Sequence, residues 1–114
     1  MPSDRYIAGR NKYGAVRTAV DGITFASKRE AGRYSELKLL ERAGEIAELT
    51  LQPKFPIWID GVKVCTYIAD FRYVDLSRGI TVIEDVKGMR TPVYKIKKKL
   101  TEALYPGVKI EEIS

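Results

Sequence analysis

The sequence predicts an α/β domain in which helices flank a mixed central sheet. Three observations support this prediction. A helical pattern of apolar residues begins just after residue 27, several segments rich in β-branched and aromatic residues follow it, and a second amphipathic helix precedes a last short strand. Helices and strands interleaved in this order favour a sheet of mixed direction with helices over its faces.

The first helix is predicted over about Lys28–Ala43. Ser27 followed three residues later by Glu30 is a capping-box pattern, and Gly44 is a residue type that often follows the last turn of a helix. The apolar residues at helical spacing, which we expect to face the sheet, are Tyr34, Leu37 and Leu40.

Extended segments follow this helix. The dipeptide Asp60-Gly61 is a hairpin signal, and residues 76–79 contain a second turn. The predicted strands are Ile46–Gln52, Phe55–Ile59, Val62–Val74 and Ile80–Lys87.

A second helix is predicted after Thr91-Pro92, because threonine is a good N-cap and proline suits the first helical position. It ends before Tyr105-Pro106-Gly107, and Val108–Ile113 is predicted as a closing strand. The apolar face of this helix comprises Val93, Ile96, Leu100, Ala103 and Leu104.

The 114 residues suit one domain, 1–114, in which about residues 1–12 could form a flexible basic arm. The sequence contains no histidine, which excludes Ser-His-Asp or Cys-His catalysis and a His-ligated zinc site. The lone Cys65 cannot form an internal disulfide, and no apolar run is long enough for a membrane span. We therefore expect a cytoplasmic protein with no membrane partner.

The charge is uneven. Twenty Lys and Arg residues against fifteen Asp and Glu residues give a net charge of +5, and most of the excess lies near the N-terminus and between residues 86 and 101. A polyanion is the natural partner of such segments, since each phosphate contact releases counterions. The alternative is a solvated basic face that only keeps the protein soluble.

Carboxylates interrupt two of the apolar strands. Asp85 and Lys87 are two residues apart, so both side chains leave the same face of an extended strand. The turn at residues 76–79 brings Asp70 back beside Asp85. Glu84 points to the opposite face if the strand is regular, although a shift of one residue in register would exchange it with Asp85. Buried charges of this kind are costly unless they are paired or bind a cation.

A divalent cation is one solution, because two adjacent carboxylates repel each other unless a positive charge lies between them. Hard oxygen ligands without His or Cys suit Mg²⁺ or Mn²⁺, which engage substrate phosphates. Lys87 could orient a water molecule or stabilise developing negative charge. The residues thus outline a site for phosphodiester hydrolysis, whereas the simpler interpretation is an Asp85–Lys87 salt bridge.

Asp70, fourteen residues, and then Asp85-Val86-Lys87 resembles the D-x(n)-(D/E)-x-K signature of the PD-(D/E)xK nuclease superfamily, although Ala69 stands where the superfamily name has proline. The order of elements is similar to the restriction-endonuclease-like αβββαβ core. A wider set of segments resembles a small phage and prophage family in that superfamily: Asn11-Lys12-Tyr13-Gly14, Phe25 to Glu30, Leu51-Gln52-Pro53, Ala69-Asp70-Phe71, Glu84 to Gly88 and Tyr105-Pro106.

The resemblance implies four catalytic residues, namely Glu30, Asp70, Asp85 and Lys87. It also implies that Glu30, Asp70, Asp85 and the backbone carbonyl of Val86 hold Mg²⁺ or Mn²⁺, with no small-molecule cofactor. Glu30 has an alternative role as a helix cap, and the two roles are compatible.

Candidate DNA contacts come from the basic residues near this site and from a few polar ones. Gln52 resembles a recurring residue near the metal site of related nucleases, but it could equally be an edge-strand hydrogen bonder. Tyr94 could stack on bases or pack, and we favour packing for Tyr105. The candidate DNA-binding residues are Arg10, Lys12, Tyr13, Arg17, Arg29, Gln52, Arg90, Lys95, Lys97, Lys98 and Lys99.

The resemblance implies a magnesium-dependent endodeoxyribonuclease of phage or prophage origin in a bacterial host. We expect branched DNA as the substrate, since no base-reading module is visible. Such an enzyme would be similar to Holliday-junction resolvases of the endonuclease I type, and paired incision would need a homodimer. The alternatives are a nicking or end-processing nuclease, an RNA-directed nuclease, and a non-catalytic DNA-binding module.

Overall fold

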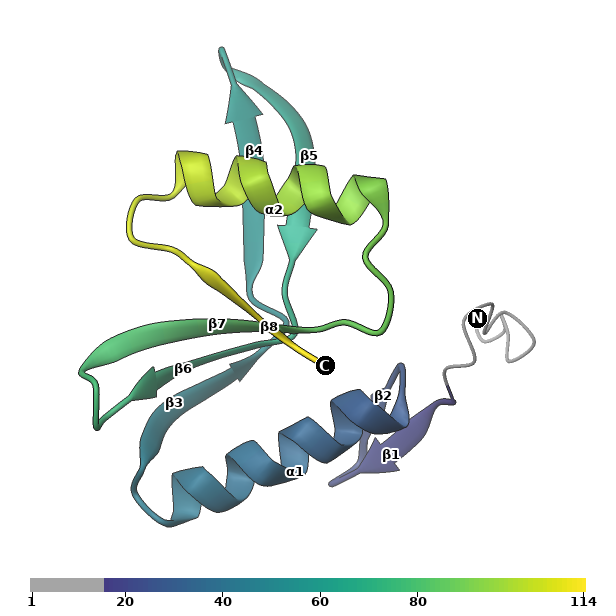
Figure 1. Cartoon of the computed structure of the whole chain (residues 1–114), viewed down its shortest axis with the longest axis vertical. Coiled ribbons are helices and arrows are strands. Elements are labelled where there is room, and N and C mark those ends of the chain that lie inside the picture. The colour runs from purple at the N-terminus through teal and green to yellow at the C-terminus, as the bar shows by residue number, and fades with distance from the viewer. Residues whose placement is uncertain (1–15) are drawn as a thin grey trace.

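The computed structural model describes residues 16–114, which form a small α/β structure with two helices and a mixed sheet (Figure 1). Three of the candidate DNA contacts, Arg10, Lys12 and Tyr13, lie outside the described residues. In chain order the elements are β1 (Thr18–Val20), β2 (Ile23–Phe25), α1 (Lys28–Arg42), β3 (Ile46–Leu51), β4 (Lys54–Ile59), β5 (Val62–Ile68), β6 (Phe71–Asp75), β7 (Ile80–Val86), α2 (Pro92–Leu104) and β8 (Ile110–Ile113).

The main sheet has four strands in the order β3-β6-β7-β8. Strands β3, β6 and β7 pair antiparallel, whereas β8 pairs parallel to β7 after the chain has passed through α2. The sheet is therefore of mixed direction, as predicted. The β6–β7 register pairs Phe71 with Glu84, which brings the preceding residue, Asp70, level with Asp85.

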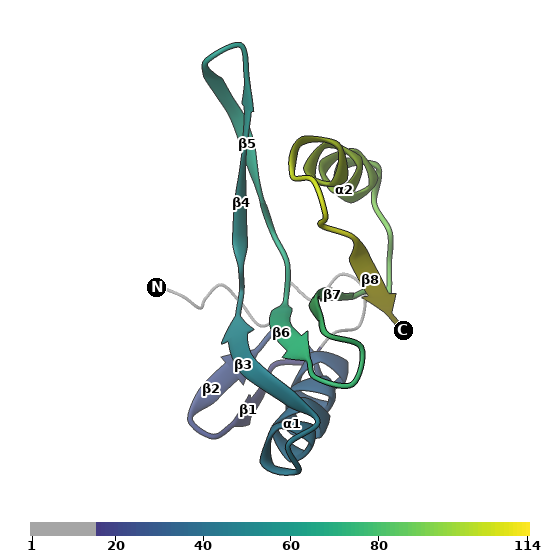
Figure 2. The same ribbon diagram turned by 90° about the vertical axis from the view of Figure 1, so that its left-hand side faces the viewer.

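The two faces of this sheet are covered differently. On one face α1 packs through Tyr34 and Leu37 against Phe71 and Val82, as predicted. Leu40, which was expected on the same face, is exposed instead. On the other face α2 and the β4–β5 hairpin cover a second cluster that includes Ile83. Figure 2 shows α1 and α2 in separate regions, with β7 between them. Alternate residues of β7 therefore point into different environments.

The β4–β5 hairpin forms a two-stranded sheet of its own, and we call residues 54–68 the arm. Its turn is Asp60-Gly61, as predicted, with both residues at positive φ. Both views show the arm projecting past α2 (Figures 1 and 2). The prediction of a single strand over Val62–Val74 is therefore wrong, because the structure divides this segment into β5 and β6. The chain leaves the arm at Ala69, whose N–H donates to the Pro53 carbonyl, and Asp70 then joins the main sheet.

Both helices begin as predicted. The Ser27 hydroxyl accepts a hydrogen bond from the Glu30 N–H at 3.1 Å, and the Thr91 hydroxyl accepts one from the Tyr94 N–H at the same distance. Helix α1 ends one residue earlier than expected, with Ala43 as its C-cap. Such contacts satisfy N–H groups that have no partner within the helix.

The interpretation of the apolar face of α2 needs a correction. Its buried residues are Tyr94 and Thr101, whereas Val93 and Ile96 on the apolar stripe are exposed. Tyr94 and Thr101 instead pack beneath the helix, where the Thr101 hydroxyl donates to the Lys97 carbonyl. The most apolar side of α2 consequently faces away from the sheet.

The short β1–β2 hairpin was not predicted. It packs through Phe25 on Tyr34 of α1, with ring centroids 5.0 Å apart, and turns at Asp21-Gly22. Neither of the two helices in the described part of the chain is long and apolar enough to cross a membrane.

Candidate active site

Asp70 lies at the junction of three segments. Its N–H donates to the Glu84 carbonyl at 3.0 Å and its carbonyl accepts from the Gln52 N–H at 2.9 Å. Its side-chain Oδ2 accepts a hydrogen bond from the Val86 N–H at 2.7 Å. The backbone of β3 and β7 thus fixes both the main chain and the carboxyl group of Asp70.

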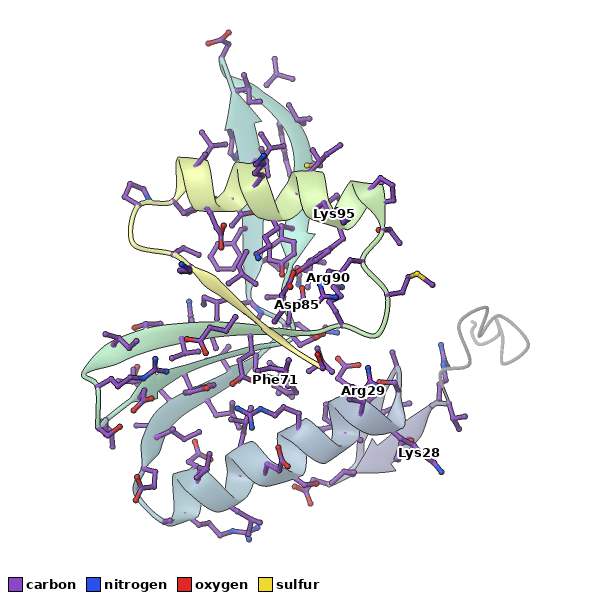
Figure 3. The ribbon with its side chains drawn as sticks, in the orientation of Figure 1. Lys28, Arg29, Phe71, Asp85, Arg90 and Lys95 are labelled. Atoms are coloured by element: carbon purple, nitrogen blue, oxygen red, sulfur yellow. The ribbon has the colours of Figure 1, made fainter. Side chains whose placement is uncertain are left out.

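Asp85 lies on the α2 side of β7 (Figure 3) and is almost fully buried. The Tyr67 hydroxyl donates to its Oδ2, and Lys87 Nζ lies 3.0 Å from its Oδ1 as an ion pair. Lys87 Nζ is also 4.3 Å from the centroid of the Tyr94 ring. Asp85 and Lys87 thus share one face of the strand, as their spacing predicts.

Glu30 contacts Asp70 from the first turn of α1. Glu30 Oε1 accepts a hydrogen bond from the Ala26 N–H at 3.2 Å, so the residue supports the helix start. Burial, followed by a hydrogen bond with Glu30 and the charge of Glu30, raises the pKa of Asp70 to about 7. The Val86 N–H and Lys87 oppose that rise. Capping and a place in the site are therefore combined in one side chain.

Burial also raises the pKa of Asp85 to about 6, and the negative charge of Asp70 adds to that rise. The hydrogen bond from Tyr67 and the positive charge of Lys87 act in the opposite direction. Two neighbouring carboxyl groups whose pKa values are both raised keep their protons to a higher pH than isolated carboxyl groups unless a cation replaces the protons. This electrostatic conflict is the feature that a divalent cation would relieve.

Glu84 belongs to the opposite face, as expected for a regular strand. It is completely buried, and its carboxylate accepts hydrogen bonds from Arg33 Nε at 2.8 Å and Arg33 Nη2 at 2.6 Å. The Tyr73 hydroxyl donates to the same group. Glu84 therefore ties β7 to α1, and the register leaves Asp85 on the side of Lys87.

A cleft with a volume of about 970 Å³ opens at this end of the sheet. Its lining includes Glu30, Asp70, Val86 and Lys87, together with Arg29 near the N-terminus of α1 and Tyr94 of α2. Asp85 lies beneath this surface rather than on it. The elements that bring these residues together are the first turns of both helices and the end of β7 (Figure 3).

The carboxylates suit a hard cation chemically but are not arranged as a finished metal cage. Among residues 16–114, no three His, Cys, Asp or Glu side chains are grouped so that they could hold a metal ion. However, Asp85 Oδ1 is buried and its contact is the ion pair with Lys87 rather than a hydrogen bond, and Asp70 faces Glu30. A buried carboxylate oxygen beside paired carboxyl groups fits Mg²⁺ or Mn²⁺, which prefer oxygen ligands.

A smaller hollow of about 370 Å³ lies on the other side of Glu30 and Asp70. Arg17 and Gln52 line it, together with apolar residues of β2 and β3. Gln52 has a φ of 52°, a left-handed backbone conformation that is uncommon for residues other than glycine. Its N–H bond to Asp70 holds this conformation and explains why the residue lies beside the carboxylates.

The remaining basic candidates divide into two groups. Arg90 Nε donates to Glu112 Oε1 at 2.8 Å, Lys97 Nζ donates to the Thr66 carbonyl at 3.3 Å, and Lys98 Nζ lies 3.5 Å from Glu112 Oε2. Lys95 and Lys99 are exposed on α2. The run of lysines in α2 is therefore partly engaged within the protein.

Tyr94 and Tyr105 both pack, and their hydroxyls donate to Glu112 Oε2 and to the Pro56 carbonyl. One further residue that contacts the site was not predicted, namely Tyr67, which binds Asp85. Arg33, which binds Glu84 on the other face of β7, was not predicted either. Tyr67 and Asp85 come from different hairpins, so no local spacing links them. Arg33 lies one helical turn after Glu30, so the sequence alone shows that the two side chains are on the same side of α1.

Neither a curated protein nor a solved structure matches this chain. A family model does match, over residues 10–114, which includes every site residue described above. The chain therefore belongs to the family described as DUF1064, a protein family of unknown function.

Proposed function

We propose that this protein is a metal-dependent endodeoxyribonuclease that hydrolyses phosphodiester bonds in branched or structured DNA, with the four-way junction as its leading substrate. The observation that carries the proposal is one cleft lined by Glu30, Asp70, Val86 and Lys87, with Asp85 directly beneath it. These are the residues that the resemblance to PD-(D/E)xK nucleases assigns to catalysis and metal binding.

The fold supports the same proposal. If the arm is set aside as an insertion between β3 and β6, the order from α1 onward is helix, three strands, helix and strand. That order agrees with the αβββαβ core of the superfamily. The proposed catalytic carboxylates lie immediately before β6 and near the end of β7, at the same end of the β6–β7 pair.

Each residue has a proposed role. Glu30, Asp70, Asp85 and the Val86 carbonyl would hold Mg²⁺ or Mn²⁺, which supplies charge neutralisation and polarises the scissile phosphate. Lys87, held between Asp85 and the Tyr94 ring, would orient the attacking water or stabilise the negative charge that develops on phosphate oxygens. In the hydrolysis, the water oxygen would bond to phosphorus and lose a proton to solvent, one ester P–O bond would break, and the leaving oxygen would take a proton from solvent.

The proposed substrate follows from the type of positive charge near the cleft. Arg29 lines it, and exposed Lys95 and Lys99 lie on the adjoining helix. Long basic side chains of this kind bind the phosphate backbone and carry little sequence information. Recognition of DNA shape is therefore more plausible than recognition of sequence, and paired cuts in a junction would require two copies of the chain.

The test is cleavage of a labelled four-way junction, a flap, a nicked duplex and a plain duplex, with Mg²⁺, with Mn²⁺ and with chelator. We expect metal-dependent paired cuts in the junction and none with Asp70→Asn. Asp75→Asn is the matched control, because it removes a carboxylate at the other end of β6, the strand that Asp70 immediately precedes.

Cleavage of the flap or nicked duplex alone would keep the nuclease and replace the resolvase with an end-processing or nicking enzyme. Cleavage of a single-stranded RNA added to the same assay would identify an RNA-directed nuclease. Binding of junctions without any cleavage under both metals would overturn the enzymatic proposal and favour a non-catalytic DNA-binding module.

A further inference from the structure

Helix α2 presents its apolar stripe to solvent. Val93 and Ile96 are 62% and 60% exposed, and Leu104 is 44% exposed. Together with half-buried Leu100 they follow the i, i+3, i+7, i+11 spacing of one side of a helix. A stripe of this kind normally packs against the protein core, so its exposure calls for an explanation.

The position of the stripe follows from the contacts of its neighbours on the helix. Lys97 faces the arm, because its Nζ donates to the Thr66 carbonyl. Glu102 faces β8, because its carboxylate accepts a hydrogen bond from the Ile110 N–H at 2.8 Å. Successive residues of a helix are turned by about 100° about its axis. This rotation places the stripe next to Lys97 and opposite Glu102, on the side of α2 that faces away from β8. That side is the one toward the free end of the arm (Figure 1).

The outer part of the arm is apolar and exposed as well. Helix α2 crosses the arm at the Pro56–Thr66 pair, since Tyr105 and Lys97 donate to their carbonyls. The arm continues beyond this crossing to its turn, and both views show its end standing free of α2 (Figures 1 and 2). The exposed apolar residues in this outer part are Trp58, Ile59, Val62 and Val64.

We propose that a second copy of this chain covers this surface, which comprises the α2 stripe and residues 58–64 of the arm and is called the arm–helix surface below. In the resulting two-fold dimer each arm lies over the partner's α2. The proposal deepens the proposed function, because paired incision needs two active sites, but it depends only on the shape and chemistry of this surface.

The area is sufficient for a stable dimer. Ile59 pairs with Val62, and Trp58 pairs with Lys63. These two pairs lie on opposite faces of the arm, so the partner must enclose both faces to cover them. The exposed parts of the seven apolar side chains then amount to roughly 700 Å² per copy, close to the ~800 Å² that each partner contributes to a standard interface. Residues near a two-fold axis meet their own copies, so like charges there would repel each other. The stripe carries no charged residue, and the outer arm carries the opposite charges Asp60 and Lys63.

These properties favour a second copy over nucleic acid. A DNA-binding surface needs an excess of cations to contact phosphates, whereas the charges of the arm–helix surface sum to zero. The basic residues on α2 that remain exposed, Lys95 and Lys99, lie on other sides of the helix. The two proposed surfaces, for DNA and for a second copy, therefore do not overlap.

The experiment measures assembly of the full-length chain without metal or DNA, so its outcome is independent of cleavage. Sedimentation velocity at concentrations from about 1 μM upward should reveal a dimer. Ile96→Glu should weaken dimerisation at least tenfold, since it places a charge in an apolar contact. Leu39→Glu is the matched control, because Leu39 is an equally exposed apolar residue on α1.

Trp58 provides a second readout, because it is the only tryptophan in the sequence and is 53% exposed. Its emission should move to longer wavelength as the wild-type dimer is diluted, and should stay there for Ile96→Glu at every concentration. This measurement tests whether the arm is in the interface, and it needs no substitution in the arm.

A monomer at all concentrations would overturn the proposal, as would a dimer that Ile96→Glu leaves intact or a dimer that both variants dissociate equally. A dimer whose Trp58 emission is independent of concentration would also overturn it, because its interface would lie elsewhere. A monomer whose Trp58 emission changes only when a four-way junction is added would assign the arm to nucleic acid instead.

Discussion

Asp70 Oδ2 accepts a hydrogen bond of 2.7 Å from the backbone N–H of Val86, the residue that separates Asp85 from Lys87. One carboxylate is thus held by the strand that carries the other two charged groups of the candidate site. The contact is between a side chain and the backbone, so a substitution at Val86 would leave the N–H in place. The relative position of the two motif segments is therefore built into the β6–β7 pairing.

Asp85→Asn should abolish cleavage while DNA binding is largely retained. The substitution keeps the shape of the side chain but removes a charged oxygen ligand from the proposed metal site. Cleavage of the preferred substrate and its binding in chelator should be measured in parallel, with Asp75→Asn as the control. Retained turnover would remove Asp85 from the active site.

Lys87→Ala should reduce the single-turnover cleavage rate by about 100-fold, the usual effect of losing one group that stabilises transition-state charge. The Mg²⁺ concentration that gives half-maximal rate should change little. Lys87→Arg keeps the positive charge and should recover part of the rate. An unchanged rate for Lys87→Ala would mean that the residue only forms a salt bridge with Asp85.

The two groups of lysines on α2 should behave differently. Lys95→Ala combined with Lys99→Ala removes two exposed charges, so the slope of log K against log salt should fall by about 2. Lys97→Ala combined with Lys98→Ala is the matched control, because those lysines contact Thr66 and Glu112. This control variant should lower the free energy of unfolding and leave the slope of log K against log salt nearly unchanged. Equal slopes for the wild type and the first variant would show that Lys95 and Lys99 do not touch DNA.

Without metal, the protein should become more stable as the pH falls from 8 to 5. Folding raises the pKa values of Asp70 and Asp85 from 3.8 to about 7 and about 6, so the folded state binds protons that the unfolded state has released. If the two groups titrate independently, the gain in unfolding free energy should be roughly 4 kcal/mol. Carboxylates with lowered pKa values, such as Glu112 at about 2, lose their contribution only at lower pH.

Thermal unfolding in chelator at several pH values measures this effect. Asp70→Asn should flatten the profile and raise the melting temperature at pH 8, because the amide carries no charge. Saturating Mg²⁺ should also flatten the wild-type profile. A stability that is constant, or that falls from pH 8 to pH 5, would contradict the charge conflict at Asp70 and Asp85.

Arg33→Met should destabilise the fold by about 3 kcal/mol, because it leaves the fully buried Glu84 without its cationic partner. Adding Glu84→Gln to this variant should restore part of the loss. Glu36→Gln removes the exposed partner of Arg33 and should cost less than 1 kcal/mol. Urea unfolding of the wild type and the three variants measures these differences in unfolding free energy. If Arg33→Met cost no more than Glu36→Gln, Arg33 would have only a surface role.

Local patterns in the sequence predicted the elements whose signals are local. The Ser27 and Thr91 caps gave both helix starts, and Asp60-Gly61 gave the turn of the arm, because capping and turn geometry depend on neighbouring residues. The break at Ala69 could not be predicted in this way. No turn residue marks it, and the hydrogen bonds that redirect the chain reach Pro53 and Glu84.

The site shows the same division. Alternation along β7 predicted that Asp85 and Lys87 share a face, and the turn length predicted that Asp70 lies beside them. The contact of Tyr67 with Asp85 depends on the path of the arm, which the sequence does not reveal. Similarly, the apolar pattern of α2 identifies the stripe, but whether the chain itself covers that stripe depends on tertiary structure.

The arm leaves and rejoins the sheet at nearly the same point, since Pro53 and Ala69 are hydrogen-bonded to each other, as are Gln52 and Asp70. Residues of the outer part of the arm, 58–64, can therefore be added or removed without moving either flanking strand, whereas the inner part contacts α2 and Asp85. The interval from Asp70 to Asp85 can likewise change only at its turn, residues 76–79, because the pairing of Phe71 with Glu84 at the base of the β6–β7 hairpin must be kept. A sequence pattern for relatives of this protein should accordingly fix the spacing within Asp85-Val86-Lys87 and allow both hairpins to vary in length.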